Sequence, residues 1–135
     1  MGMHPIPLSE TDNHVLFKEH EEVFLFDKDS NEEIWRTSFY GEANIGFLGL
    51  VSDWAIVGGD RLLLWKSNEL KFIEDPDLIW IHDIRQVEDD VVEILTDPWG
   101  EQPAIWKFDV LSEQKVKIRD FEDYKEKEYT DLVEW

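Results

Sequence analysis

Short apolar segments, each ended by turn-forming residues, constrain the fold of this chain more than any other feature. In the segment Glu22–Asp27, Val23 and Leu25 fall on one face of an extended strand, and Phe24 and Phe26 fall on the other. Successive side chains of a strand point to opposite faces, so a strand that is apolar on both faces is expected to be buried. The same criteria predict about eleven strands. They are His14–Lys18, Glu22–Asp27, Glu33–Ser38, Ala43–Val51, Asp53–Val57, Arg61–Lys66, Leu70–Glu74, Leu78–Ile84, Val91–Thr96, Ala104–Asp109 and Lys115–Arg119.

This succession predicts an all-β fold of mainly antiparallel strands. We expect a meander of about 10–11 short strands that forms a sandwich, a barrel or a partial propeller-like sheet. No long amphipathic segment lies between the strands, which excludes helices on both faces of a parallel sheet. A chain of 135 residues is expected to form a single domain. Within it, residues 1–12 are predicted to be an N-terminal extension and residues 120–135 an acidic C-terminal segment.

Two local signals refine this prediction. Gly58-Gly59, followed by Asp60, indicates a hairpin turn, because glycine adopts positive φ without a steric penalty. In the C-terminal segment, four residues recur at three- and four-residue spacing, which favours a short closing helix. The residues that carry this spacing are Phe121, Tyr124, Glu128 and Leu132.

A faint internal repeat accompanies the strands. Phe26-Asp27 matches Phe108-Asp109 at a spacing of 82 residues, which is twice 41, and Trp65-Lys66 lies near the midpoint. A unit of about 40 residues with three or four strands resembles one blade of a β-propeller in a generic way. Similar hairpin chemistry in unrelated strands is the alternative explanation, because any meander of short strands yields such spacings.

Cysteine is absent from the sequence, which excludes a disulfide scaffold and thiolate chemistry. The segment Met1–Asp12 has no basic region followed by an apolar run, so we do not expect it to be a signal peptide. No apolar stretch approaches the roughly 18 residues that a membrane span requires. These observations together predict a cytoplasmic protein.

The charge is the strongest indication of function. The 32 acidic residues exceed the 13 basic ones and give a formal net charge of −19. Binding to nucleic acid or to an anionic membrane is therefore not expected. The complementary partner is a basic protein, such as a toxin domain whose cationic groove binds nucleic acid. Solubility alone is the simpler explanation, but a charge of about 2–8 is enough for that in a small domain.

Catalytic signatures are absent from the sequence. No nucleophile elbow, phosphate-binding loop, dinucleotide fingerprint or zinc-protease motif occurs. His14 and His20 flank one predicted strand and could share a metal ion with nearby glutamates, but their spacing matches no known ligand signature. His82 and Asp83 are adjacent on a predicted strand and therefore face opposite ways. We expect neither a catalytic residue nor a metal or other cofactor.

The loop from Asp97 to Pro103 is the best candidate for an interaction site. Trp99 lies between Pro98 and Gly100, and tryptophan is enriched among the residues that dominate binding energy at interfaces. We expect Trp99 to be an exposed anchor within a ring of acidic side chains, although folding back against a core edge is equally compatible with the sequence. The acidic residues predicted to surround it are Asp97, Glu101, Glu88, Asp89, Asp90, Asp75 and Asp77.

The function that fits these observations best is a non-catalytic binding protein that neutralises a basic partner. Its most concrete form is an immunity or inhibitor protein against a toxin such as a nuclease. A carbohydrate- or peptide-binding module that uses exposed tryptophan side chains is the alternative. A small metal-assisted hydrolase that uses the histidines is a further alternative.

Overall fold

Twelve β-strands make up the regular structure of the residues that the structure describes. The computed structural model describes residues 5–50 and 53–135. Within these ranges all regular structure is strand, so no helix there is long and apolar enough to cross a membrane. The strands form three separate four-stranded antiparallel sheets, each of them a meander, and the sheets are not closed into a barrel. The predicted all-β antiparallel fold is therefore confirmed, with one strand more than expected.

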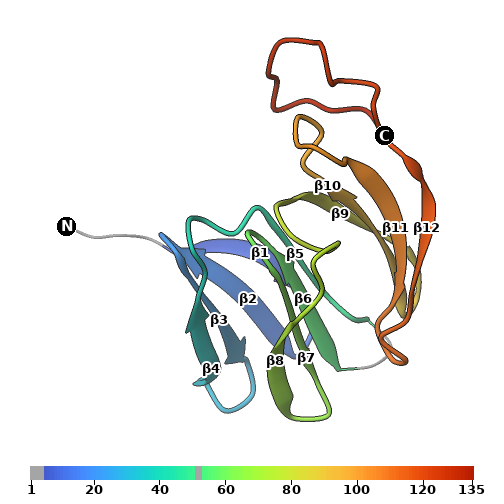
Figure 1. The fold of residues 1–135 in the computed structure, drawn as a ribbon. Helices are drawn as coiled ribbons and strands as arrows, with labels where there is room; N and C mark the ends of the chain where they lie inside the picture. Colours follow the sequence, from blue (N-terminus) through green and yellow to red (C-terminus); the bar gives the residue numbers. More distant parts are fainter. Residues whose placement is uncertain (1–4, 51–52) are drawn as a thin grey trace.

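The three sheets follow one another along the chain (Figure 1). The first contains β1 (Ile6–Glu10), β2 (His14–Glu19), β3 (Glu22–Asp27) and β4 (Glu32–Ser38). The second contains β5 (Ile45–Leu48), β6 (Trp54–Gly58), β7 (Leu62–Lys66) and β8 (Glu69–Ile73). The third contains β9 (Ile81–Glu88), β10 (Val91–Thr96), β11 (Ala104–Asp109) and β12 (Lys115–Asp120). Val51, the predicted end of one strand, lies outside the described residues.

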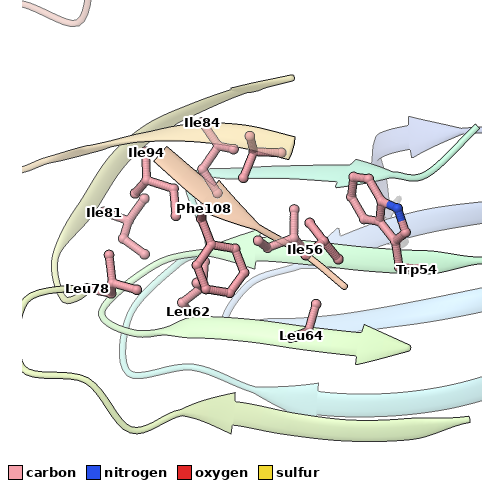
Figure 2. Packing of buried hydrophobic residues seen from close by; sticks show 11 residues of the cluster. Trp54, Ile56, Leu62, Leu64, Leu78, Ile81, Ile84, Ile94 and Phe108 are labelled. Atoms are coloured by element: carbon pink, nitrogen blue, oxygen red, sulfur yellow. The ribbon is translucent and has the colours of Figure 1, made fainter. Parts of the chain in front are cut away.

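The second sheet packs between the other two, and alternation along its strands explains how. Ile56 and Leu64 belong to the cluster shared with the third sheet, whereas Val57 and Leu63 belong to the cluster shared with the first. Figure 2 shows the first of these clusters, in which Phe108 of β11 reaches toward the second sheet. A sheet that is covered on both faces needs apolar residues at every position, which is the pattern of β6 and β7.

The internal repeat has a structural counterpart. The carboxylate of Asp27 accepts hydrogen bonds from the amides of the next turn, and Asp109 makes the same contacts between β11 and β12. Both turns end on a residue of positive φ, Asn31 at 60° and Glu113 at 63°. The corresponding turn of the second sheet is a tighter hairpin through Ser67 and the next residue, with φ positive at both. The predicted unit of about 40 residues is thus one four-stranded sheet.

The turn predicted at Gly58-Gly59 exists, but the reason given for its glycines is wrong. Neither glycine has positive φ. A Cβ at Gly58 would lie 2.5 Å from Cγ2 of Ile81, and one at Gly59 would lie 2.8 Å from Cδ2 of Phe39. These glycines are therefore required by the close approach of neighbouring elements rather than by backbone conformation.

Both ends of the chain differ from the prediction. Residues 6–10, assigned to an N-terminal extension, form β1 and pair with β2, while residues 1–4 lie outside the described part. The C-terminal helix is absent: residues 121–135 form turns and irregular structure. Phe121, Tyr124 and Trp135 of this segment pack beside Leu95 and Ile105 on the third sheet. A short, highly acidic segment gains little from isolated helix formation, and packing against the sheet determines its conformation instead.

Candidate binding groove

Two connecting loops border a groove of about 500 Å³ at one end of the third sheet. One loop joins β8 to β9 and the other joins β10 to β11, and side chains of β11 and β12 complete the lining. The residues that matter for its chemistry are Asp77, Ile79, Trp80, Asp97, Glu101 and Trp106. The groove therefore combines two indole rings with three carboxylates, and we call it the Trp80 groove.

Trp80 is the most exposed tryptophan of this groove, and hydrogen bonds fix its backbone at both the amide and the carbonyl. Its amide donates a hydrogen bond to the carbonyl of Asp60 at 3.0 Å, and its carbonyl accepts one from the amide of Asp97 at 2.8 Å. Its φ is 49°, in the left-handed region that side chains rarely adopt. The indole is nevertheless 55% exposed. The second of these bonds joins the two loops and places Trp80 beside Asp97.

The loop after β10 is shaped by Asp97. Its carboxylate accepts a hydrogen bond from the amide of Trp99, and its carbonyl accepts one from the amide of Gly100, each at 3.0 Å. Asp97 itself takes part in no ion pair with any described residue. Glu101, at the tip of the same loop, is exposed and likewise lacks an ion pair within the described part of the chain. These two carboxylates carry the uncompensated charge of the groove.

Trp99, which the sequence analysis expected to be exposed, is less exposed than Trp80. It is half-buried, and its indole nitrogen donates a hydrogen bond to the carbonyl of Lys127 at 3.0 Å. The rings of His82, Tyr124 and Tyr129 surround it at centroid distances of 6.1, 5.9 and 4.9 Å. The C-terminal segment, which lies beside the β10–β11 loop in Figure 1, therefore covers Trp99.

The acidic residues predicted to act together are divided between two places. Asp77, Asp97 and Glu101 line the groove. Glu88, Asp89 and Asp90 lie at the β9–β10 turn, at the opposite end of strands that span roughly 20 Å. Asp90 also has a structural role, because its carboxylate accepts a hydrogen bond from the indole of Trp54 at 2.9 Å.

Asp75 and Asp77 are compensated by a single lysine. The ammonium group of Lys115 lies 2.7 Å from a carboxylate oxygen of each. Burial by itself raises the pKa of Asp75, but the hydrogen bonds from Lys115 and from the amide of Asp77 outweigh it and lower that pKa. Burial also opposes the charge of Lys115, and its two aspartate partners raise its pKa above the ordinary value. This ion-pair cluster ties the β8–β9 loop to β12.

Trp80 and Trp106 line the candidate groove but were not among the residues predicted from the sequence. Trp80 was placed inside a strand predicted to begin at Leu78, whereas β9 begins at Ile81. Trp106 was placed correctly on a strand, and its ring lies under the ammonium groups of Lys115 and Lys117, at 4.4 and 5.6 Å from the centroid. The turn-forming residues Asp75-Pro76-Asp77 come shortly before Trp80, and they were the local indication that Trp80 belongs to the loop rather than to the strand.

The histidines do not form a metal site in the described part of the chain, where no group of three or more ligand side chains meets. His14 and His20 stand at opposite ends of β2, and a strand of that length separates them by roughly 20 Å. The ring of His14 packs edge-on against Trp65 at a centroid distance of 5.7 Å. The alternative of a hydrolase that uses both histidines at one metal ion therefore loses its geometric basis.

Comparison with models of known protein families and with curated proteins finds no match.

Proposed function

We propose that this protein is a non-catalytic acidic binding protein of the cytoplasm that captures and neutralises a basic protein. The most concrete form is an immunity or inhibitor protein against a toxin such as a nuclease. The observation that carries the proposal is the Trp80 groove, where an exposed indole lies beside the carboxylates of Asp97 and Glu101, which form no ion pair with a described residue. A partly apolar anchor within an acidic surface provides both lasting affinity and electrostatic attraction.

The distribution of ion pairs supports the sign of the partner's charge. Of the 13 basic residues, only Lys107 and Lys127 form no ion pair with a described residue. The cations of the chain are thus almost entirely used internally, and the excess of carboxylates remains for solvent or a partner. Such a surface accelerates association with a cationic protein and repels nucleic acid.

The test uses the product of the gene next to the one that encodes this chain, because inhibitors and their toxins are expected to be produced together. Both proteins are purified, and association is followed by stopped-flow fluorescence at increasing salt concentration. We expect a stable one-to-one complex whose association rate falls steeply with salt, and loss of the partner's activity in the complex. A neighbour that does not bind, or that binds at a rate independent of salt, contradicts the proposal.

Charge variants distinguish long-range attraction, which sets the association rate, from direct contacts, which set the dissociation rate of that complex. Glu101→Lys in the groove and Glu32→Lys on β4 change the net charge equally, but Glu101→Lys should slow association more, because salt screens charges that lie far from the contact. Only Glu101→Lys should also increase the dissociation rate, because it alone alters the groove. Equal dissociation rates for the two variants would place the contact face elsewhere.

A glycan-binding module is the second candidate, because Trp80 and Trp106 line the same groove together with carboxylates that accept hydrogen bonds from hydroxyl groups. Binding of a neutral oligosaccharide, measured by calorimetry, should then be insensitive to salt and should require Trp80. Salt-sensitive binding of a basic protein, with no response to glycans, favours the first candidate.

A further inference from the structure

All four arginines of the chain share one environment. Each guanidinium lies over an aromatic ring and also contacts a carboxylate. The ring partners are Phe24 for Arg36, Phe72 for Arg61, Trp135 for Arg85 and Phe121 for Arg119, at 3.7–5.0 Å from the ring centroids. The carboxylate partners are Glu22 and Glu33, Asp60, Glu93 and Asp123, in the same order. This protein therefore repeatedly holds a guanidinium between a ring and an acid.

The Trp80 groove presents the same two components without a guanidinium. The indole of Trp80 is 55% exposed, and no cation of a described residue lies over it. The backbone hydrogen bond between Trp80 and Asp97 sets a carboxylate-bearing residue next to the ring. Glu101 lines the same hollow and makes no ion pair in the described part of the chain.

The lysines near this groove contact aspartates and the ring of Trp106 rather than the ring of Trp80. Lys115 is engaged by two aspartates. Lys117 lines the groove, but its ammonium group lies 2.6 Å from a carboxylate oxygen of Asp120 and over the ring of Trp106. These lysines thus compensate Asp75, Asp77 and Asp120, while Asp97 and Glu101 form no ion pair within residues 5–50 and 53–135.

We infer that the Trp80 groove binds an arginine side chain presented by the basic partner. This inference rests on the proposed function and specifies the chemistry of its recognition. The planar guanidinium stacks on the indole and donates hydrogen bonds to the carboxylates of Asp97 and Glu101. Arginine fits better than lysine, because its flat, weakly hydrated group can stack and pair at the same time, whereas an ammonium is a compact, strongly hydrated point charge.

Short peptides of defined charge test the inference with the full chain. Three blocked peptides carry arginine, lysine or citrulline at the same central positions, and binding is measured by calorimetry at low salt. The arginine peptide should bind several-fold more tightly than the lysine peptide, and the uncharged citrulline peptide should bind at least about tenfold more weakly than the arginine peptide. Equal affinity for arginine and lysine would show a nonspecific charge effect and overturn the inference.

Variants locate the binding on the groove. Trp80→Ala should weaken the arginine peptide about tenfold, and Trp80→Phe, which keeps an aromatic face, should retain much of the affinity. Glu101→Gln should weaken it several-fold, whereas the matched Glu32→Gln, with the same change in net charge, should have little effect. If Trp80→Ala does not fold, the pair of glutamate variants and the citrulline peptide still decide the question.

The outcomes separate this inference from the proposed function. If the neighbouring gene's product binds but the peptide preference is lost or independent of Trp80, the arginine site is wrong and the general function stands. If the arginine peptide binds through Trp80 but no basic protein partner does, the proposed function is wrong and the site stands. Binding of a neutral glycan in the groove, with no response to the arginine peptide, overturns both.

Discussion

Replacing Gly58 with alanine should destabilise the protein by closing the space between the second and third sheets. The added Cβ would lie 2.5 Å from Cγ2 of Ile81 and 3.1 Å from Cδ1 of Ile84, and both isoleucines are almost fully buried. The amide of Ile81 also donates a hydrogen bond to the carbonyl of Gly59, which limits how far β9 can move away. The sheets must therefore shift, or the isoleucine side chains must leave their preferred rotamers.

The expected change in the free energy of unfolding for Gly58→Ala is the difference between two effects. Overpacking a core position costs about 1–3 kcal/mol. Alanine regains about 0.5–1 kcal/mol relative to glycine in a strand, because it loses less conformational freedom on folding. The net loss in the free energy of unfolding should be about 1–2 kcal/mol, equivalent to a decrease in the melting temperature of about 4–8 °C for a chain of this size.

Urea denaturation followed by circular dichroism measures this loss, and a second substitution identifies its cause. Ile81→Ala removes the methyl group that the new Cβ would meet, so the double variant should lose less stability than the sum of the two single variants. The control is Gly41, which has φ of +85° and open space around it. Gly41→Ala should be strained by its backbone and additive with Ile81→Ala. A Gly58→Ala variant as stable as the parent protein, or a strictly additive double variant, would refute the packing argument.

Two further predictions concern charge. The excess of negative charge repels itself, so the melting temperature should be higher in a few hundred millimolar salt than without salt, and a decrease would mean that local ion pairs outweigh this repulsion. Hydrogen bonds from the amides of Ser112 and Leu111 hold the pKa of Asp109 below its ordinary value. A depressed pKa stabilises the folded state above the unfolded pKa of about 4, and this contribution is lost as the pH falls through the folded pKa. The stability advantage of the parent protein over Asp109→Asn, measured by urea denaturation, should therefore be constant above about pH 5 and shrink in stronger acid; an advantage independent of pH would contradict it.

The strands could be predicted from the sequence because their signals are local. Alternation and turn residues depend on neighbours in the chain, and eleven of the twelve strands in the described ranges were predicted in this way. β1 was missed because Pro7 lies within it, and proline usually argues against a strand. Since β1 is the edge of its sheet, it tolerates the missing amide donor.

The groove was only partly predictable, because exposure depends on contacts between distant parts of the chain. Asp77, Asp97 and Glu101 were identified from loop chemistry, and all three line it. Trp99 and Trp80 both follow turn-forming residues, and their local sequences do not show which of them is covered. Tyr124 and Tyr129 of the C-terminal segment pack on Trp99, and nothing comparable packs on Trp80 among the described residues. The sequence therefore predicted an exposed indole at this end of the third sheet, but not that Trp80 would be more exposed than Trp99.

The backbone at Trp80 allows the geometry of the groove to be tested separately from ligand binding. Trp80→Gly and Trp80→Ala remove the same ring, so they differ only in what the backbone prefers. At φ of 49° a side chain is strained, whereas glycine is not. The glycine variant should be more stable than the alanine variant by about 1 kcal/mol, measured by urea denaturation, and both should bind the arginine peptide equally weakly. In an extended strand, which the sequence predicted for this position, alanine would be the more stable of the two. A more stable alanine variant would therefore refute the loop conformation that aims this indole into the groove.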